Sequence, residues 1–296
     1  MIKIAMIGGA KHFHARSWSQ MFNGSNKELV KEHKFPVFAD NVRAKGAKVT
    51  HVYDDNRADA ELLAKTCDIP NVVDRQEDVI GKVDAVMIAD DCSMKHQKRA
   101  AVFLKESIPT FADKPLSADP REAEAIIDLA RKHKAPFMSC SALRFACEIE
   151  EFNRKDRDAV GEVVTGNAIG HNELVFYGIH PLEALITLVG PGVKSVRNAG
   201  SINRDLLALE YKDGRLFTLT ANKEMGYVFQ VNLYGTKGWR QLTISDGAYF
   251  YVTMLKRFIQ MVKTGRGPFS PDETLEIIRI LAAGAKLRNS TKKILI

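Results

Sequence analysis

The first half of the chain alternates short apolar runs with helix patterns, and this alternation constrains the fold more than any other feature. Strand candidates lie at 2–7, 48–53, 83–89, 109–112 and 136–140, with helix patterns between them. Strands that alternate with helices form a parallel sheet, and the helices cover both of its faces. The pattern therefore predicts an α/β domain with a doubly wound parallel sheet.

The second half has a different rhythm, because strand candidates follow one another almost directly. They lie at 162–170, 205–211, 215–222, 228–235 and 239–244. Asp213-Gly214 between two of them is typical of a hairpin, since this pair tolerates the positive φ of a tight turn. Hairpin-linked strands predict an open antiparallel sheet, and the two helix patterns after it complete an α+β domain.

A chain of 296 residues is close to the size at which one hydrophobic core divides into two. We predict a first domain over 1–118, completed by a connecting helix and strand over 119–145. A second domain is predicted over 146–296. Its last helix could pack either within this domain or back against the first domain.

The composition is that of an ordinary globular protein, with 45% hydrophobic and 27% charged residues. Lysine and arginine exceed aspartate and glutamate by 43 − 36 = 7, but the basic residues form short, dispersed clusters at 95–99, 131–134 and 292–293. We expect the first two clusters to be solvated helix surfaces. A basic patch with interleaved aromatic residues is missing from the sequence, so no nucleic-acid partner is predicted.

Cysteine usage and hydropathy indicate a reducing compartment. Cys67, Cys92, Cys140 and Cys147 contain no Cys-x-x-Cys pair, which predicts mostly buried, reduced thiols and neither a zinc site nor a disulfide framework. No apolar run reaches the roughly 18–20 residues that span a bilayer, and the strand at 2–7 leaves no room for a signal peptide. We predict a cytoplasmic protein without a membrane partner.

Gly8-Gly9-Ala10 follows the first strand, where a doubly wound fold places the phosphates of a dinucleotide. Small residues let the backbone approach the pyrophosphate, and the next helix N-terminus supplies N–H donors. The motif is degraded, because a full G-x-G-x-x-G would need glycine at positions 10 and 13, so a tight turn without ligand stays an alternative. The cofactor-binding candidates in this segment are Gly8, Gly9, Ala10, His12, Phe13 and His14. The two histidines could instead cap the helix, and no third ligand indicates a metal site.

Asp54 and Asp55 end the second strand, where a carboxylate can accept hydrogen bonds from the adenosine ribose. A carboxylate there repels a 2′-phosphate, so Asp54 favours NAD over NADP. A helix N-cap is the alternative role of Asp54, and the two roles are compatible. Gly8 and Asp54 are 54 − 8 = 46 positions apart, against the usual ~20, which predicts a polar insertion at roughly 23–46.

Four segments together resemble one family of proteins. Ala112-Asp113-Lys114-Pro115-Leu116-Ser117 is similar to the Glu-Lys-Pro segment of the Gfo/Idh/MocA family, which includes glucose–fructose oxidoreductase and inositol dehydrogenase. Met87–Cys92 with His96 is similar to its strand-end Thr-Pro-Asn and downstream histidine. Gly178–Glu183 is similar to its Gly-x-His-x-x-Asp segment, and His14-Ala15 matches its His-Ala two residues early.

The resemblance implies an NAD(P)-dependent oxidoreductase (EC 1.1.1.-) that transfers a hydride between nicotinamide and a secondary hydroxyl of a sugar, polyol or related small molecule. It implies an N-terminal Rossmann domain and a C-terminal open antiparallel sheet. One face of that sheet would line the substrate site, and the other would make a homodimer or homotetramer. Asp90, Asp113 and Lys114 are further cofactor-binding candidates, and the Lys114–Pro115 bond is expected to be cis.

The family's catalytic lysine falls on Lys114 and its histidine on His180. Alcohol oxidation needs a base near neutral pKa, which suits histidine, and an ammonium that stabilises developing alkoxide charge. A solvated turn for Lys114 and a structural histidine at a helix start for His180 are the alternatives if each residue is taken alone. Their joint match favours a catalytic pair.

One departure from the family puts this mechanism in doubt. An Asp usually stands four residues before the histidine and orients its imidazole, but Phe176 occupies that position. Glu183, one helical turn after His180, is a candidate to compensate, as are Tyr177 and His171. We therefore include Glu183 among the catalytic candidates.

Two alternative functions stay open. Phe176 and the degraded glycine loop also suit a Rossmann-type protein that binds a dinucleotide or sugar without turnover, and some relatives carry out NAD-assisted elimination or glycoside cleavage. Arg144 near the domain junction is a candidate to bind an anionic group or to form a salt bridge. The aromatic stretch 249–251 is expected to be core.

Overall fold

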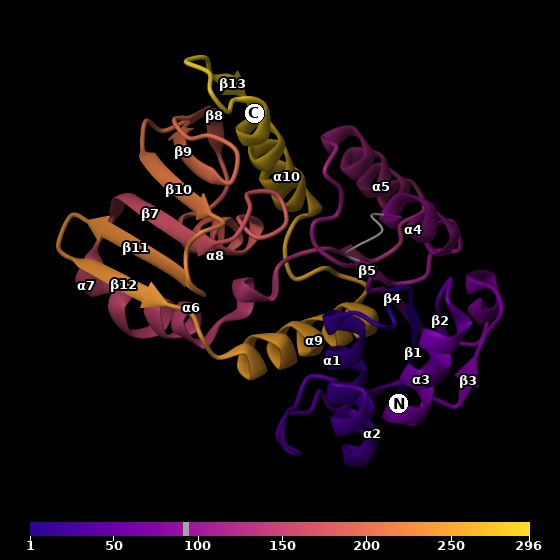
Figure 1. The fold of residues 1–296 in the computed structure, drawn as a ribbon. Helices are drawn as coiled ribbons and strands as arrows, with labels where there is room; N and C mark the ends of the chain where they lie inside the picture. Colours follow the sequence, from indigo (N-terminus) through magenta and orange to yellow (C-terminus); the bar gives the residue numbers. More distant parts are fainter. Residues whose placement is uncertain (91–94) are drawn as a thin grey trace. The chain divides into compact units, whose positions relative to one another are not determined.

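The computed structural model describes residues 1–90 and 95–296 and comprises two compact units, each with its own sheet (Figure 1). Unit 1 consists of Met1–Ser117, Arg121–Ser139 and Tyr251–Pro271, and unit 2 of Ala118–Pro120, Cys140–Phe250 and Asp272–Ile296. Asp91 and Cys92, which belong to one of the family-like segments, lie outside the described residues. The domain boundaries expected at 118 and 145 stay predictions.

Unit 1 contains a parallel sheet of six strands in the order β3-β2-β1-β4-β5-β6. The strands are β1 (Ile2–Ile7), β2 (Ala47–Tyr53), β3 (Asn71–Val72), β4 (Ala85–Ile88), β5 (Thr110–Ala112) and β6 (Phe137–Met138). All of β4 is fully buried, as expected for a central strand covered on both faces. The strand order reverses between β1 and β4, which confirms the doubly wound sheet and places a ligand crevice at their carboxyl ends.

Helices connect these strands. They are α1 (Phe13–Asn23), α2 (Lys27–Glu32), α3 (Arg57–Cys67), α4 (His96–Lys105) and α5 (Pro120–Lys132), with a 3-10 turn at Gln76–Val79. Most of α9 (Gly247–Thr264) also belongs to unit 1. The insertion expected at 23–46 contains α2, and it is not purely polar, because Val30, Phe35 and Ala44 in it are buried.

Unit 2 contains a seven-stranded sheet in the order β12-β11-β7-β10-β9-β8-β13. The strands are β7 (Val163–His171), β8 (Val193–Asn198), β9 (Arg204–Tyr211), β10 (Leu216–Asn222), β11 (Phe229–Gly235), β12 (Trp239–Thr243) and β13 (Ile294–Leu295). The sheet is largely antiparallel, as predicted, but β10 pairs with β7 in parallel. The helical connection after β7 makes β8 run in the same direction as β7. The chain then reverses twice, from β8 to β9 and from β9 to β10, so β10 also runs parallel to β7. The sequence patterns also missed β8 and β13.

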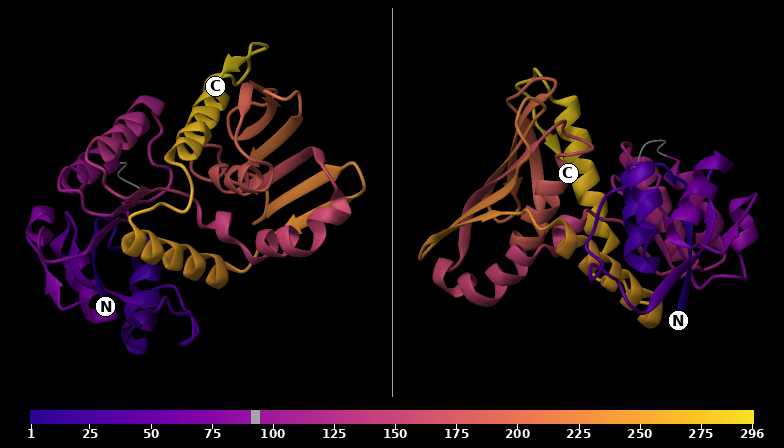
Figure 2. Two further views of the ribbon diagram at one scale, coloured as in Figure 1. Left: turned by 180° about the vertical axis from the view of Figure 1, so that it is seen from behind. Right: turned by 60° about the horizontal axis from the view of Figure 1, so that its bottom comes forward.

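Helices cover one face of this second sheet. The helical segments are Ala142–Phe145, α6 (Cys147–Glu151), the π-helical turn Phe152–Asp156, α7 (Arg157–Val160), α8 (Ile179–Val189) and α10 (Pro271–Lys286). The right-hand view of Figure 2 shows α10 along one side of the strands. Helix α10 approaches β9 closely at Gly284, where an added Cβ would lie 2.7 Å from the Leu207 side chain. Leu207 of β9 therefore packs against α10, and burial alternates along β9.

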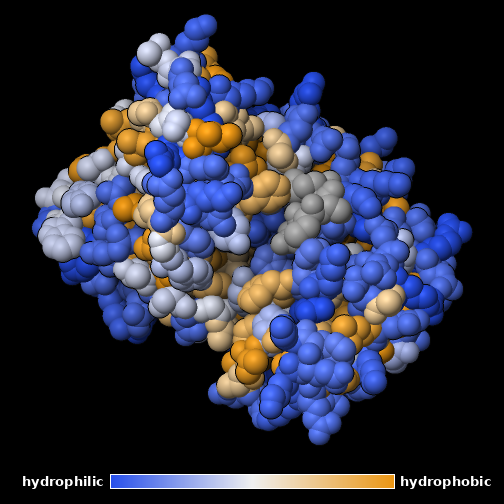
Figure 3. All heavy atoms as spheres, viewed as in Figure 1, coloured by the Kyte–Doolittle hydropathy of each residue, from blue (hydrophilic) through white to orange (hydrophobic). Residues whose placement is uncertain are grey.

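The surface carries no sign of a membrane span. Across the described residues, every helix is too short or too polar to cross a bilayer. Hydrophilic residues dominate the surface seen in Figure 3, and hydrophobic residues form small separate groups on that face.

Candidate functional site

The turn after β1 approaches the end of β4 so closely that side chains are excluded. Gly8 and Gly9 have φ values of +71° and +68°, and a Cβ added at Gly9 would lie 2.0 Å from the Ala89 carbonyl oxygen. The turn leads directly into α1, whose first N–H groups have no partner within the helix and favour an anion. His12 occupies the N-cap position without a side-chain capping bond, so the alternative that it caps the helix is wrong.

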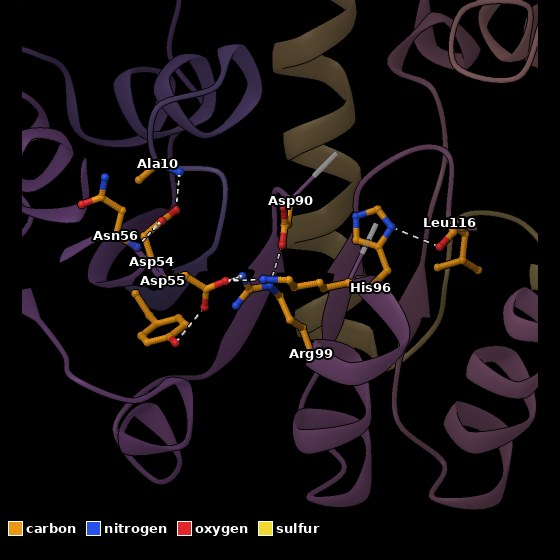
Figure 4. Close-up of polar contacts among 10 residues, drawn as sticks. Ala10, Asp54, Asp55, Asn56, Asp90, His96, Arg99 and Leu116 are labelled. Atoms are coloured by element: carbon orange, nitrogen blue, oxygen red, sulfur yellow. Dashed lines mark hydrogen bonds and ion pairs between the residues drawn. The ribbon is translucent and has the colours of Figure 1, made fainter. Parts of the chain in front are cut away.

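The carboxylate of Asp54 holds this turn in place. Its Oδ2 accepts the backbone N–H of Ala10 at 2.8 Å, and its Oδ1 accepts that of Asn56 at 2.9 Å (Figure 4). The N-cap of α3 is Asn56, whose side chain accepts from Ala58, so the capping alternative for Asp54 is wrong. A carboxylate has about four acceptor positions, and two remain for a ligand such as a ribose hydroxyl.

Arg99 is a site residue that the sequence patterns missed. Its guanidinium lies between two strand-end carboxylates, with Nε 2.7 Å from Asp90 and a terminal nitrogen 2.9 Å from Asp55 (Figure 4). Burial lowers the pKa of Arg99, but the two carboxylates raise it overall. The expected solvated surface at 95–99 is therefore wrong for Arg99, which is 5% exposed. Its helical spacing with the buried Phe103 was the signal for this position.

Lys114 is the second residue after β5 and lies in a turn that is held on both sides. The Lys114–Pro115 peptide is cis, as the family resemblance implied. His96 Nδ1 lies 3.1 Å from the Pro115 carbonyl and 3.0 Å from that of Leu116, so its N–H donates to both. On the other side, the Asp113 carboxylate accepts the Lys114 backbone N–H at 2.7 Å. The lysine is thus carried by a rigid strand-end turn and is 7% exposed.

His14 does not extend a free imidazole from the glycine turn. Its Nδ1 is 2.5 Å from Asp113 Oδ2, and its Nε2 is 3.2 Å from the Tyr251 hydroxyl. The side chain is 8% exposed, and these contacts engage both ring nitrogens inside unit 1. Its backbone can still face a phosphate at the start of α1, but its side chain and that of Asp113 are committed to each other.

His180 begins α8 in unit 2, and its Nδ1 is 2.7 Å from the Ser141 hydroxyl. The rings of Tyr177 and Phe229 lie edge-on to the imidazole, at 5.9 and 5.2 Å between centroids. A serine hydroxyl can accept from an Nδ1–H, which leaves the lone pair on Nε2. Ser141 therefore occupies the orienting position at Nδ1, and sequence reasoning had not identified it.

Glu183 has a different partner from the one expected. Its carboxylate accepts from Arg144 Nε at 2.7 Å, and another Arg144 nitrogen is 2.8 Å from Glu273. Burial raises the pKa of Glu183, and Arg144 offsets only part of that rise. The orienting bond that we expected Glu183 to make to His180 is supplied by Ser141 instead. Arg144 forms the salt bridge that was the alternative to an anion site.

Two of the described thiols are poor nucleophiles, because burial raises the pKa of Cys67 to about 12 and that of Cys147 to about 11. Cys67, Cys140 and Cys147 form no disulfide bond. Residues 1–90 and 95–296 contain no group of three or more potential ligands that could hold a metal ion.

Comparison with known proteins finds a family model that matches the first half of the chain. Residues 2–140, slightly less than half of it, match the GFO_IDH_MocA family model, described as "Oxidoreductase family, NAD-binding Rossmann fold". No curated protein matches the chain.

Solved structures share the fold over the full length. Myo-inositol dehydrogenase from Corynebacterium glutamicum has a TM-score of 0.81 at 14% identity, covering 100% of this chain and 99% of that one. Scyllo-inositol dehydrogenase from Lactobacillus casei with bound NAD(H) and scyllo-inositol has a TM-score of 0.79 at 14% identity, with coverages of 100% and 99%. GenD2 from gentamicin A biosynthesis, in complex with NAD, has a TM-score of 0.81 at 14% identity, with coverages of 100% and 96%. At these identities, the likeness shows a common fold.

Proposed function

Since residues 2–140 belong to the Gfo/Idh/MocA oxidoreductase family with its NAD-binding Rossmann fold, we propose that this protein is an NAD-dependent dehydrogenase or reductase. The observation that carries the proposal is the carboxyl-end edge of the unit 1 sheet, which carries a glycine turn anchored by Asp54 after β1 and the turn that holds Lys114 two strands away, after β5. The proposed substrate is a sugar, polyol or related small molecule with a secondary hydroxyl. The solved structures of similar fold include two inositol dehydrogenases, which supports this class. A cytoplasmic location is part of the proposal.

The residues of unit 1 fit a dinucleotide. The glycine turn leaves no room for a Cβ at Gly9, and a turn without side chains gives a pyrophosphate close access to the backbone and to the start of α1. Asp54 keeps acceptor positions for the ribose, and its charge disfavours a 2′-phosphate. When bound, the nicotinamide supplies the hydride acceptor or donor.

The protein's own residues would handle the substrate oxygen and its proton. Lys114 would bind the reacting oxygen and stabilise its developing negative charge. His180 would take the hydroxyl proton on Nε2, with Ser141 fixing its ring orientation. Glu183 would act indirectly, by holding Arg144 beside the Ser141 segment. A serine stabilises the imidazolium less than a carboxylate does, so the base would be weaker than in relatives that carry the Asp.

Titration with NADH and an assay against a panel of sugars, polyols and amino sugars test this function together. We expect fluorescence to report NADH binding, and absorbance to report net reduction of NAD by at least one compound. Failure of NADH to bind at millimolar concentration would refute the proposal. Binding without hydride transfer would favour a binding protein, and turnover with catalytic NAD but no net reduction would indicate elimination or glycoside cleavage.

Replacement of Asp54 by asparagine tests the cofactor assignment. The loss of a charge-assisted bond to the ribose, about 1.5–3 kcal/mol, corresponds to roughly tenfold or more weaker NADH binding. The preference for NADH over NADPH should narrow, because the repulsion of a 2′-phosphate is removed. Fluorescence titration with both cofactors measures this. Asp59→Asn in the first turn of α3 is the control, and equal losses for both variants would contradict the role of Asp54.

We also propose that the uncovered face of the unit 2 sheet joins two copies of the chain. Three cross-strand rows of five residues cross its middle: Leu206–Thr220–Ile169–Gln230–Thr243, Ala208–Thr218–Asn167–Asn232–Gln241 and Glu210–Leu216–Thr165–Tyr234–Trp239. Glu210 is the one charged side chain in these three rows, although 27% of the chain is charged. Leu216 and Trp239 are 52% and 61% exposed. A face with a single charged side chain in these rows and with exposed apolar side chains suits a two-fold interface with a second copy.

Thr218→Arg should convert the proposed dimer or tetramer to smaller species. Thr218 lies in the middle row. In a two-fold interface each copy would contribute one arginine at this position, so two like charges would be buried together. Sedimentation equilibrium of the full-length protein measures the change. Gln260→Arg, on the exposed side of α9, is the matched control. A monomeric wild type, or a Thr218→Arg variant of unchanged mass, would contradict this interface.

A further inference from the structure

A buried hydrogen bond between two side chains joins α1 to the residue before Lys114. His14 Nδ1 is 2.5 Å from Asp113 Oδ2, although the residues are 99 positions apart in the chain. The side chain of Asp113 is 1% exposed and that of His14 is 8% exposed. A carboxylate at this depth needs a charged or hydrogen-bonded partner, since an unpaired buried charge is strongly destabilising. The imidazole is therefore the group that allows an ionised Asp113 at this position.

The same carboxylate also holds the peptide of Lys114. Asp113 Oδ1 accepts the Lys114 backbone N–H at 2.7 Å, while Oδ2 faces His14. One rigid group thus joins the imidazole on α1 to the backbone that carries the lysine. On the far side of the turn, His96 donates to the two carbonyls that follow. The backbone around Lys114 is held by one histidine on each side.

His14 itself has little freedom to move. Its ring stacks on Trp18 with 4.9 Å between centroids and 6° between planes. Trp18 in turn packs edge-on against Phe111 of β5 at 5.3 Å. Nε2 is fixed by the Tyr251 hydroxyl of α9 at 3.2 Å. A rotation of the imidazole would break the stack and both polar contacts together.

We propose that His14 and Tyr251 are positioning residues for Lys114, and that they act through Asp113. The chain Tyr251–His14–Asp113–Lys114 fixes the lysine turn to the first helical turn of α1, the end of the helix that faces the dinucleotide phosphates in the proposed function. The inference rests on the proposed role of Lys114. Displacement of a reacting group by about 1 Å can slow an enzyme 10²-fold, so this anchoring affects the chemical step more than binding.

The pKa of Asp113 provides a second way to test the proposed anchoring of Lys114 by His14. Burial raises the pKa of Asp113, but His14, Lys114 and His96 face it and lower its pKa overall. Tyr251 is the group that faces His14 from α9. When the imidazole is removed, the burial remains and the largest opposing contribution is lost. The pKa of Asp113 should then rise, whether or not the protein catalyses hydride transfer.

The kinetic experiment compares His14→Phe, His14→Asn and Tyr251→Phe in the full-length protein. Phenylalanine keeps the stack on Trp18 without either nitrogen, whereas asparagine keeps a donor near the Nδ1 position. We expect kcat to fall roughly 10- to 100-fold in His14→Phe with the NAD KM nearly unchanged, and to be largely restored in His14→Asn. Tyr251→Phe should show a smaller loss of kcat. His133→Phe is the control for a histidine outside the chain. A wild-type kcat in His14→Phe, or an equal loss in the asparagine variant, would overturn the proposal.

Carbon-13 NMR of the Asp113 carboxyl provides a readout without activity. The expected result is a low pKa of Asp113 in the wild type and in Tyr251→Phe, and a raised one in His14→Phe. If hydride transfer is absent in the wild type but this shift occurs, the proposed function fails while the Asp113 anchor stands. An unchanged pKa of Asp113 in His14→Phe would refute the anchor. If that variant does not fold, the same measurement on His14→Asn decides, because asparagine also removes the imidazole whose interaction lowers the pKa of Asp113.

Discussion

Lys114→Met should reduce kcat/KM for hydride transfer by about 10²–10⁴-fold, the range for loss of a group that assists proton transfer or charge development. Methionine keeps an unbranched side chain up to the ε position and removes the ammonium. The backbone of the turn is held independently by Asp113 and His96, so the structure of the site should survive. Steady-state kinetics with the best substrate of the panel measures the loss.

NADH binding distinguishes a catalytic role of Lys114 from a structural one. The dissociation constant of Lys114→Met should stay within a few-fold of the wild type, because the anchors of the glycine turn lie in Asp54 and α1. Lys132→Met, at the exposed end of α5, is the control for loss of a lysine. A wild-type rate for Lys114→Met would remove the lysine from the mechanism. A loss confined to NADH affinity would reassign it to cofactor binding.

Arg144→Met should lower the free energy of unfolding by about 3–5 kcal/mol, the usual cost of leaving one partner of a buried ion pair without the other. The side chain of Glu183 is 1% exposed and that of Arg144 is 6% exposed. The substitution leaves the buried Glu183 carboxylate without its guanidinium partner. Urea unfolding of the wild type and the variant measures the difference.

The pH dependence of this loss follows from the Glu183 carboxylate. Its pKa is already raised in the folded protein and should rise further without Arg144, so the folded state binds a proton that the unfolded state releases. Stability of Arg144→Met should therefore fall as pH rises above the unfolded pKa of Glu183, and the deficit should shrink below it. Glu61→Gln, which breaks the exposed pair with Arg57, is the control, with an expected change of about 0.5 kcal/mol or less. An equally small change in Arg144→Met would contradict the importance of the buried pair.

The sequence alone was enough for the features that depend on neighbouring residues. The alternation of strand and helix patterns predicted the doubly wound sheet. A strand that is buried on both faces consists of a continuous run of hydrophobic residues, and such a run can be recognised in the sequence. Gly8-Gly9 directly after a strand predicted the turn, and the residues around Lys114 predicted the family whose model matches residues 2–140. The separate strands of unit 2 were largely recognised, but the parallel pairing of β7 with β10 depends on a crossover that no local pattern records.

The partners of the site residues were decided by tertiary structure. Arg99 looked like part of a solvated cluster, but the fold places it between two strand-end carboxylates. His14 meets Asp113 across 99 positions, and Ser141 meets His180 across 39. Glu183, expected beside that histidine, pairs with Arg144 instead. Residue type and spacing establish which side chains can ionise or donate. Only the packing of elements distant in the chain decides which charges are buried together, and that burial determines their partners and their pKa values.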